Sequence, residues 1–307
     1  MILSCGEALI DMLPRQSTDG EVAFAPYPGG AVFNTAIALG RLGAPAGFFS
    51  GMSTDLFGEM LETALHDSQI DASFAARSDR PTTLAFVKLT GGQASYAFYD
   101  ENTAGRMLSP QDLPNLPQEI STLFFGGISL VGEPCGSAYE ALMAREAPSR
   151  VTMIDPNIRP SFITDEPAYR ARIERMIALA DIVKLSDEDL QWLLGAGKVS
   201  VLARTLLDQG PKLICITEGA SGARGITATG EVFVPATKVK VADTVGAGDT
   251  FNAGVLAALH NAGALTKDSI ANLDDQVLTD ALTLGVRAAA ITVSRPGANP
   301  PRAYELD

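Results

Sequence analysis

The sequence predicts an α/β protein: a doubly wound, mostly parallel sheet flanked by helices, with a small antiparallel β lid. Three observations lead to this prediction. Strand and helix segments alternate in the second half, a hairpin pattern without a helix occurs in the first half, and polar residues follow the strands. Such alternation is typical of βαβ units, and open sheets of this kind bind ligands beyond the carboxyl ends of their strands. We expect a single domain over residues 1–307.

Apolar runs and helical periodicity place the individual elements. In the first half we expect strands at residues 2–5 and Ala46–Ser50, and helices at Thr35–Leu42 and Leu56–His66. In the second half strands and helices alternate regularly. The strands expected there are Thr122–Phe125, Val151–Ile154, Asp181–Leu185 and Leu213–Ile216, and the helices lie near 136–146, 166–179, 187–193 and 199–208.

Residues 82–99 differ from the alternating pattern. Alternating and aromatic residues lie on both sides of Gly91-Gly92, which indicates a β-hairpin with a glycine turn. No helix interrupts it, so we expect an antiparallel appendage. The predicted lid consists of about 12–30 and 82–100, inserted within the domain.

Composition excludes several classes of protein. The chain has 307 residues, of which 46% are hydrophobic and 19% charged, as in an ordinary globular protein. Its net charge of −13 argues against nucleic acid or an anionic membrane surface as a partner. We see no signal peptide, and no run of the roughly 18 apolar residues that span a bilayer. Cys5, Cys135 and Cys215 are too far apart for a zinc site or a disulfide framework, so we expect a cytoplasmic protein.

The segment Asp243–Leu259 combines an anion-binding helix start with a carboxylate. Gly246, Ala247 and Gly248 leave backbone N–H groups uncrowded at the positive end of the helix dipole. Asp249 lies in the same first turn, where it can accept a hydroxyl proton. This arrangement suits phosphoryl transfer. A well-capped helix without further function is the alternative interpretation.

Two features of the N-terminal segment also suggest binding. Gly29 and Gly30 precede a helix and permit close approach by a ligand, while Asn34 offers a donor and an acceptor. Asp11 follows the first strand, a position often used for binding. A tight loop with a capped helix, and a solvated turn acid, are the alternative interpretations.

Other common chemistries lack their motifs. The nearest candidate for a P-loop starts at Gly195 and lacks the required glycine spacing. The glycines before Asp249 are followed by Phe251, which breaks the dinucleotide fingerprint. A Ser-His-Asp hydrolase needs a histidine, but His66 and His260 lie at expected helix ends, where capping explains them.

Two motifs resemble the ribokinase-like (PfkB) family of carbohydrate kinases: Gly29-Gly-Ala-Val-Phe-Asn34 and Asp243-Thr-Val-Gly-Ala-Gly-Asp-Thr-Phe-Asn252. The order and spacing of the elements resemble the family along nearly the whole chain. Residues 155–159 and 183–190 look most like bacterial fructokinases, with 2-keto-3-deoxygluconate kinases as close relatives. The resemblance implies an ATP-dependent enzyme that phosphorylates a primary sugar hydroxyl, with fructose as the expected sugar.

The resemblance also implies roles for individual residues. Asp249 would be the base, and the amides of Gly246, Ala247 and Gly248 would surround the γ-phosphoryl group. The implied sugar-binding residues are Asp11, Gly29, Gly30, Asn34, Asn157 and Arg159. The implied nucleotide-binding residues are Lys184, Ser186, Thr217, Gly219 and Gly222.

The implied metals are Mg²⁺ and K⁺. The family's Asn-x-x-Glu, which organises Mg²⁺ and phosphate, corresponds here to Ser186-Asp-Glu-Asp189. Pro301 replaces a usual serine near the K⁺ loop, and Val286 replaces an asparagine that many relatives have near adenine. The carbonyls implied for K⁺ are those of Asp243, Val245, Thr292, Arg295 and Gly297.

Substrate choice remains open between two sugars. The guanidinium of Arg159 could bind a substrate carboxylate in a bidentate manner, which favours a 2-keto-3-deoxy acid, or it could pair structurally with a nearby acid. The family's lid covers the sugar and often pairs in dimers, so the resemblance also implies a homodimer through the lid. A non-catalytic sugar-binding regulator on the same fold is the alternative from a different class.

Overall fold

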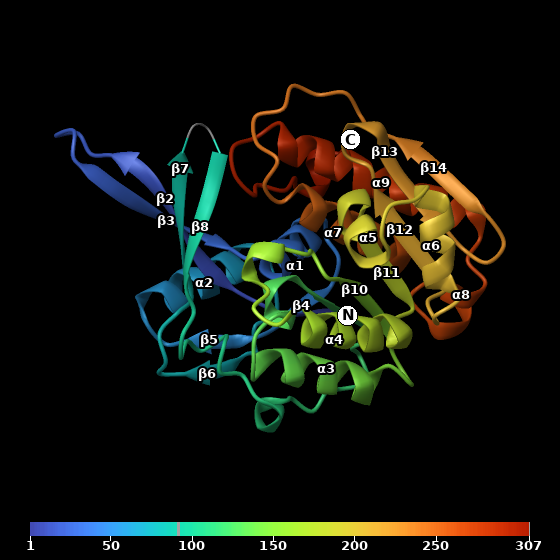
Figure 1. The fold of residues 1–307 in the computed structure, drawn as a ribbon, viewed down its shortest axis with the longest axis horizontal. Helices are drawn as coiled ribbons and strands as arrows, with labels where there is room; N and C mark the ends of the chain where they lie inside the picture. Colours follow the sequence, from blue (N-terminus) through green and yellow to red (C-terminus); the bar gives the residue numbers. More distant parts are fainter. Residues whose placement is uncertain (91–92, 307) are drawn as a thin grey trace.

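The computed structural model describes residues 1–90 and 93–306. Within these residues the centre of the fold is an eight-stranded sheet ordered β14-β13-β12-β11-β10-β9-β1-β4 (Figure 1). The strands from β12 to β4 pair in parallel, and β13 and β14 are antiparallel. The predicted, mostly parallel α/β sheet is therefore confirmed. Its strands are β1 (Ile2–Cys5), β4 (Ala46–Phe49), β9 (Thr122–Gly126), β10 (Val151–Asp155), β11 (Ile182–Ser186), β12 (Leu213–Thr217), β13 (Gly222–Ile226) and β14 (Glu231–Pro235).

Helices cover both faces of this sheet and bury two apolar cores. Successive strand residues face opposite sides, so that Ile2 lies in one core and Leu3 in the other. Burial on both faces explains why the parallel strands read as continuous apolar runs. The first core is covered by α1 (Ala31–Arg41), α2 (Leu56–Asp67), α7 (Ala247–Asn261) and α9 (Asp275–Val293), and the second by α3 (Cys135–Glu146), α4 (Glu166–Leu179), α5 (Asp187–Leu194) and α6 (Val199–Leu207).

A separate four-stranded sheet, ordered β3-β2-β7-β8, projects from the N-terminal half (Figure 1). We call it the lid sheet. Its two hairpins are antiparallel and are joined by a parallel pair between β2 and β7, which the sequence did not reveal. The predicted glycine turn at Gly91-Gly92 lies outside the described residues. The strands of the lid sheet are β2 (Leu9–Gln16), β3 (Val22–Gly29), β7 (Leu84–Thr90) and β8 (Gln93–Tyr99).

Short elements connect these layers. The remaining strands are β5 (Gly51–Ser53) and β6 (Ala76–Ser78), the remaining α-helix is α8 (Lys267–Ala271), and the 3₁₀ helices are η1 (Pro110–Asp112), η2 (Gly127–Leu130), η3 (Pro160–Phe162), η4 (Gly219–Ser221) and η5 (Ala303–Glu305).

Helix α9 is a core helix, although its length of 19 residues and its composition would suffice to cross a membrane. It packs against α7 and against β13 and β14. A Cβ atom on Gly254 of α7 would lie 2.6 Å from the Cα atom of Gly285 of α9, so the two helix backbones approach closely. This packing accounts for the apolar sequence. Because α9 contains Asp275, Asp280 and Arg287, it is not an uninterrupted run of about 18 apolar residues, which the sequence lacks.

Candidate active site

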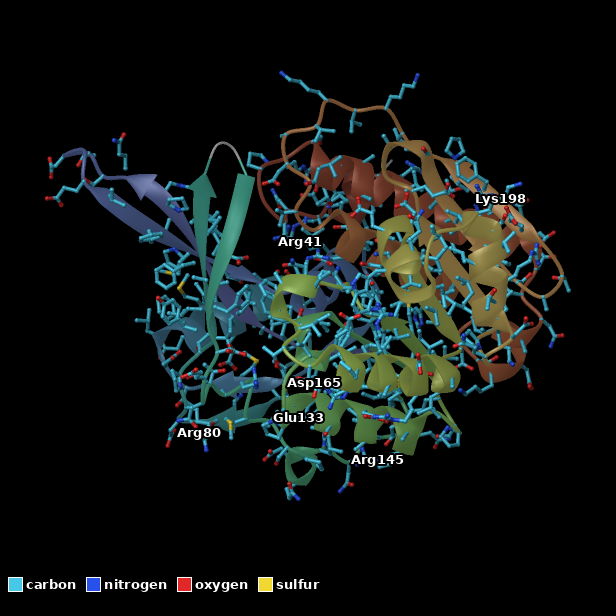
Figure 2. All side chains as sticks on the ribbon, in the orientation of Figure 1. Arg41, Arg80, Glu133, Arg145, Asp165 and Lys198 are labelled. Atoms are coloured by element: carbon cyan, nitrogen blue, oxygen red, sulfur yellow. The ribbon has the colours of Figure 1, made fainter. Side chains whose placement is uncertain are left out.

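Five buried charged residues gather in one region of the molecule. Most charged side chains lie at the periphery, as Arg80, Arg145 and Lys198 do (Figure 2). Charged groups are rarely buried unless they are paired or functional. The buried charged residues near the carboxyl ends of the parallel strands and the start of α7 are Glu7, Asp155, Lys184, Asp189 and Asp249.

The start of α7 leaves backbone donors available. Gly246 is the N-cap residue in the left-handed conformation, with φ 77°, and no side chain caps the helix. A Cβ atom on Gly246 would lie 2.8 Å from the Cβ atom of Ala298, so both its conformation and its surroundings require glycine. Ala247 and Gly248 are half-buried. The Ala247 N–H makes one long hydrogen bond, to the carbonyl of Thr244 at 3.4 Å, and the Gly248 N–H has no acceptor among the described residues. At the positive end of the helix dipole, these N–H groups form a site suited to an anion.

Asp249 lies in the first turn of α7 and is only 6% exposed. Asn34 Nδ2 donates to its Oδ2 at 2.9 Å. Burial raises the pKa of Asp249 to about 7; the nearby charge of Asp155 adds to this, while the Asn34 hydrogen bond and the Lys184 ammonium oppose it. A carboxylate with a pKa near neutrality is a better proton acceptor than an exposed aspartate.

A buried ion pair lies next to the start of α7. Lys184, on β11, donates from Nζ to Asp155 Oδ2 at 2.9 Å, and Asn252 Nδ2 donates to the same oxygen at 2.7 Å. Burial disfavours the ammonium ion, yet the charge of Asp155 holds the pKa of Lys184 above its ordinary value. A Cβ atom on Gly248 would lie 3.0 Å from Nζ, so the ammonium reaches the anion-binding turn.

Sequence reasoning had assigned no role to Asp155 or Asn252. Asn252 lies one turn after Asp249 and is 1% exposed, and its Oδ1 has no hydrogen-bond donor in the described part of the chain. Its place in the glycine-rich motif could have signalled a role, because positions three apart share a helix face. The contact with Asp155 joins residues 97 positions apart and has no local signal.

Asp11, Gly29 and Gly30 meet where the lid sheet joins α1. A Cβ atom on Gly29 would lie 2.3 Å from Asp11 Oδ2, so glycine lets the carboxylate lie against the loop. Burial raises the pKa of Asp11 to about 6. Within the described residues no donor bonds to this carboxylate, which leaves it free for a ligand. Gly30, with φ 109°, is the N-cap of α1 and has no side chain to cap it.

Asn157 and Arg159 lie just after the carboxyl end of β10. Asn157 has φ 47°, and its N–H donates to Asp155 Oδ1 at 3.1 Å. Arg159 is exposed, and its Nη1 donates to the carbonyl of Ile158 at 3.0 Å. Among the described residues Arg159 forms no ion pair, so the structure does not supply the acid partner considered for it.

The predicted nucleotide-binding residues lie at the ends of β11 and β12. Thr217 Oγ1 donates to the carbonyl of Leu185 at 3.5 Å, and Ser186 Oγ accepts from the N–H of Asp189 at 3.0 Å as the N-cap of α5. Gly219 and Gly222 follow with φ 52° and 139°. These positions lie at adjacent strand ends, close to Lys184.

The segments predicted for K⁺ are brought together by Asp243. Its Oδ1 accepts from the N–H of Val245 at 3.1 Å, and its Oδ2 accepts from the N–H of Gly297 at 2.9 Å. The carbonyls of Thr292 and Gly297 already accept backbone N–H groups. Each carbonyl retains a second lone pair, so the loop still fits a cation. Arg295 also belongs to this loop, and its guanidinium pairs with Glu305.

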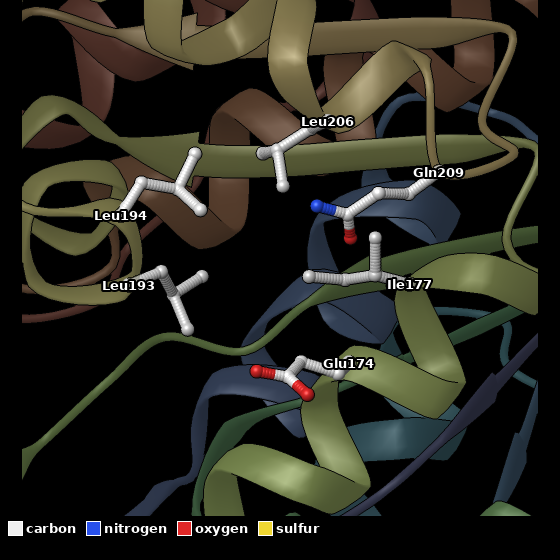
Figure 3. A pocket seen from close by; sticks show the side chains of 6 residues that line it. All are labelled: Glu174, Ile177, Leu193, Leu194, Leu206 and Gln209. Atoms are coloured by element: carbon white, nitrogen blue, oxygen red, sulfur yellow. The ribbon is translucent and has the colours of Figure 1, made fainter.

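A cavity of about 220 Å³ lies away from these residues, between α4, α5 and α6 (Figure 3). None of the predicted site residues contributes to it. Its walls are mostly aliphatic, which is typical of incomplete packing between outer helices. The lining residues are Glu174, Ile177, Leu193, Leu194, Leu206 and Gln209.

Known proteins resemble this chain over most of its length. The model of the pfkB family of carbohydrate kinases matches residues 1–303. A fructokinase of Rhizobium leguminosarum bv. trifolii is 58% identical over 278 residues, which cover 91% of this chain and 85% of that protein. The crystal structure of a Xylella fastidiosa fructokinase with bound ATP has a TM-score of 0.89 at 27% identity, covering 99% of this chain and 96% of that one. A Vibrio cholerae fructokinase double mutant, bound to fructose, ADP and potassium, has a TM-score of 0.84 at 27% identity, covering 97% and 93%.

Proposed function

The chain belongs to the pfkB family of carbohydrate kinases, and from this membership we propose that it is an ATP-dependent fructokinase. One observation supports the chemistry above all: the buried carboxylate of Asp249 stands in the first turn of a helix whose start has no side-chain cap. The identity of 58% to a fructokinase supports D-fructose as the acceptor over a 2-keto-3-deoxy acid or a nucleoside.

In the proposed reaction, a primary hydroxyl of fructose attacks the γ-phosphorus of ATP. The new P–O bond forms as the bond from the γ-phosphorus to the β,γ-bridging oxygen breaks, and ADP leaves with that electron pair. Asp249 accepts the hydroxyl proton. The amides of Gly246, Ala247 and Gly248, with the Lys184 ammonium behind them, stabilise the charge on the transferred group. Phosphoryl transfer depends mainly on such positioning and charge stabilisation.

The two substrates are proposed to bind on opposite sides of Asp249. Asp11, Gly29, Gly30 and Asn34 would bind sugar hydroxyls, since no donor among the described residues bonds to the Asp11 carboxylate and Asn34 already contacts the base. Asn157 and Arg159, at the end of β10, would complete the sugar side. The nucleotide would lie along the ends of β11 to β13, near Ser186, Thr217, Gly219 and Gly222.

Two cations are proposed as cofactors. The described residues contain no group of three or more His, Cys, Asp or Glu side chains that could hold a metal. Mg²⁺ fits nevertheless, because it binds nucleotide phosphates together with one or two carboxylates, and Asp189 is the buried acid at the nucleotide side. When bound it neutralises phosphate charge. K⁺ would be held by carbonyls of the loop that Asp243 closes, namely those of Asp243, Val245, Thr292, Arg295 and Gly297.

A homodimer through the lid sheet is part of the proposal. Val22 is 81% exposed, Phe24 43% and Tyr99 63%, all on strands of this sheet. Exposed apolar residues grouped on one sheet favour a protein partner. The proposed compartment is the cytoplasm, which suits three free, buried cysteines.

A sugar panel tests the proposed function. ADP release is measured with purified protein, ATP and Mg²⁺ across fructose, ribose, nucleosides and 2-keto-3-deoxygluconate. We expect the highest kcat/KM with fructose. A higher kcat/KM with the keto acid would contradict the fructose assignment and point to Arg159 as a carboxylate-binding residue.

A further inference from the structure

Glu7, which follows β1, is a buried carboxylate that the reaction above does not use. It is 8% exposed. Its Oε1 accepts from the N–H groups of Ala31 at 2.8 Å and Val32 at 3.4 Å, both in the first turn of α1. Its Oε2 accepts from the N–H of Ser129 in η2 at 3.3 Å. One side chain therefore satisfies backbone donors at the starts of two different helices.

The surrounding backbone is shaped around this carboxylate. A Cβ atom on Gly30 would lie 2.9 Å from the backbone oxygen of Glu7, and one on Gly127 would lie 2.1 Å from its Oε1. Gly30, as the N-cap of α1, cannot cap the helix itself. Glu7, 24 positions before Ala31, thus takes the place of the missing N-cap side chain.

The helix that Glu7 caps leads directly to the proposed base. Gly29 and Gly30 form its entrance, and Asn34, one turn further, donates to Asp249. Thr35 Oγ1 lies 3.3 Å from the backbone oxygen of Asp249. A shift of the first turn of α1 would therefore move sugar-binding groups relative to the base, and displacements near 1 Å are costly in active sites.

Glu7 also borders the base of the lid sheet. It lines a cavity of about 40 Å³ together with Thr83, just before β7, and Asp100, just after β8. Arg106 Nη1 pairs with Asp100 Oδ2 at 2.5 Å in the wall of this cavity. Glu7 thus lies where the Gly29-Gly30 loop, η2 and the ends of the lid strands meet.

We propose that Glu7 is a positioning residue for the sugar side of the reaction. Its carboxylate caps α1 in place of Gly30, ties that helix to η2, and so holds Gly29, Gly30 and Asn34 in register with Asp249. This inference rests on the proposed sugar kinase activity, but not on fructose being the sugar. It predicts different effects on the binding of the two substrates, because in the described part of the chain the Glu7 carboxylate bonds to Ala31, Val32 and Ser129 and to none of the proposed nucleotide-binding residues.

The test compares Glu7→Gln with a matched control, Asp181→Asn. Asp181 is also a buried carboxylate, 7% exposed, whose Oδ2 accepts a backbone N–H, that of Thr152 at 2.8 Å. It directly precedes β11, at the amino ends of the parallel strands, whereas the site lies at their carboxyl ends. Glutamine keeps the shape of Glu7 but turns one acceptor oxygen into a donor. Both variants are assayed by steady-state kinetics with the sugar that the wild type phosphorylates best, and by thermal unfolding.

For Glu7→Gln we expect the KM for the sugar to rise about tenfold, with the KM for ATP within about twofold of wild type. For Asp181→Asn we expect a lower melting temperature with both KM values within about twofold of wild type. An unchanged sugar KM in Glu7→Gln, an equal rise in both KM values, or the same split in Asp181→Asn would overturn the proposal.

Glu7→Asp serves as a second variant that keeps the charge. Its side chain is one methylene shorter and should not reach both helix starts, so we expect a rise in sugar KM that is smaller than for glutamine. If Glu7→Gln is insoluble, a wild-type sugar KM in Glu7→Asp overturns the proposal in its place. If the wild type does not phosphorylate fructose, that result counts against the proposed substrate and not against the role of Glu7. The variants are then compared with the sugar that the wild type phosphorylates best.

Discussion

The starts of α1 and α7 are built alike but completed differently. Each follows a glycine with positive φ, Gly30 or Gly246, and neither glycine has a side chain to cap its helix. At α1 the protein supplies the anion itself, through the carboxylate of Glu7. At α7 no side chain caps the first turn, which contains Asp249. This difference distinguishes a structural helix start from a binding one. The start of α1, capped by Glu7, holds the site together, and the uncapped start of α7 is left for a phosphoryl group.

The largest effect is expected for Asp249→Asn. Asparagine keeps the size and the contact with Asn34 but cannot accept a proton, so kcat should fall by about 10³-fold. The KM for fructose should stay within about threefold of wild type, because the sugar-binding groups remain. Steady-state kinetics checks both values. A variant with full turnover would show that Asp249 is not the base.

The pH dependence should report the same carboxylate. Burial raises the pKa of Asp249 to about 7, so at lower pH the group is protonated and cannot accept the hydroxyl proton. We expect kcat/KM for fructose to rise about tenfold per pH unit up to about pH 7 and then to level off. Rates measured from pH 5 to 9 test this. A flat profile over that range would contradict an essential base with this pKa.

Gly246→Ala tests whether the start of α7 matters for turnover in a way that an ordinary glycine turn does not. Alanine there must adopt φ 77° and would meet Ala298, whereas Gly263→Ala, the control, must adopt φ 66° with no atom within 4 Å. The left-handed backbone should cost each variant about 1 kcal/mol of stability, and the contact with Ala298 should add to this cost in Gly246→Ala. Only Gly246→Ala should lower kcat, by about tenfold or more, because the anion-binding amides move. Similar kcat losses in both variants would refute a special role for Gly246.

A smaller effect is expected on stability. A carboxyl whose pKa is raised by folding binds its proton more tightly in the folded state, so its contribution to stability falls as pH rises from about 4 to 7. The free energy of unfolding of Asp249→Asn should therefore exceed that of wild type by about 4 kcal/mol at pH 8 and differ little from it at pH 4. Denaturant unfolding at the two pH values measures this. A variant less stable than wild type at pH 8 would contradict the cost of burying the charge.

Local signals explain what the sequence predicted well. Helix α4 spans Glu166–Leu179 as expected, because Asp165 accepts from the N–H of Ala168 as an N-cap and proline occupies the first turn. The start of α7 was also readable, because its glycines and Asp249 lie within four positions. The antiparallel pair β13 and β14 was missed, although the intervening Thr229-Gly230 could have indicated a turn.

Long-range contacts explain what the sequence could not predict. Helix α1 was expected to begin at Thr35 but begins at Ala31, because its cap is Glu7 and no local residue signals it. Asn34 is consequently inside the helix and not at its entrance. The contacts of Asp155 with Lys184 and Asn252 likewise join separate strands and helices, and only the folded chain brings them together.

The comparison of the two helix starts is tested most directly by a crystal structure of the protein with fructose, ADP, Mg²⁺ and aluminium fluoride as a mimic of the transferred phosphoryl group. We predict the fluoride ligands within hydrogen-bond distance of the N–H groups of Ala247 and Gly248, and a fructose hydroxyl against Asp249. Glu7 should remain bonded to the start of α1. A mimic bound elsewhere, or an anion that displaces Glu7 at α1, would contradict the account.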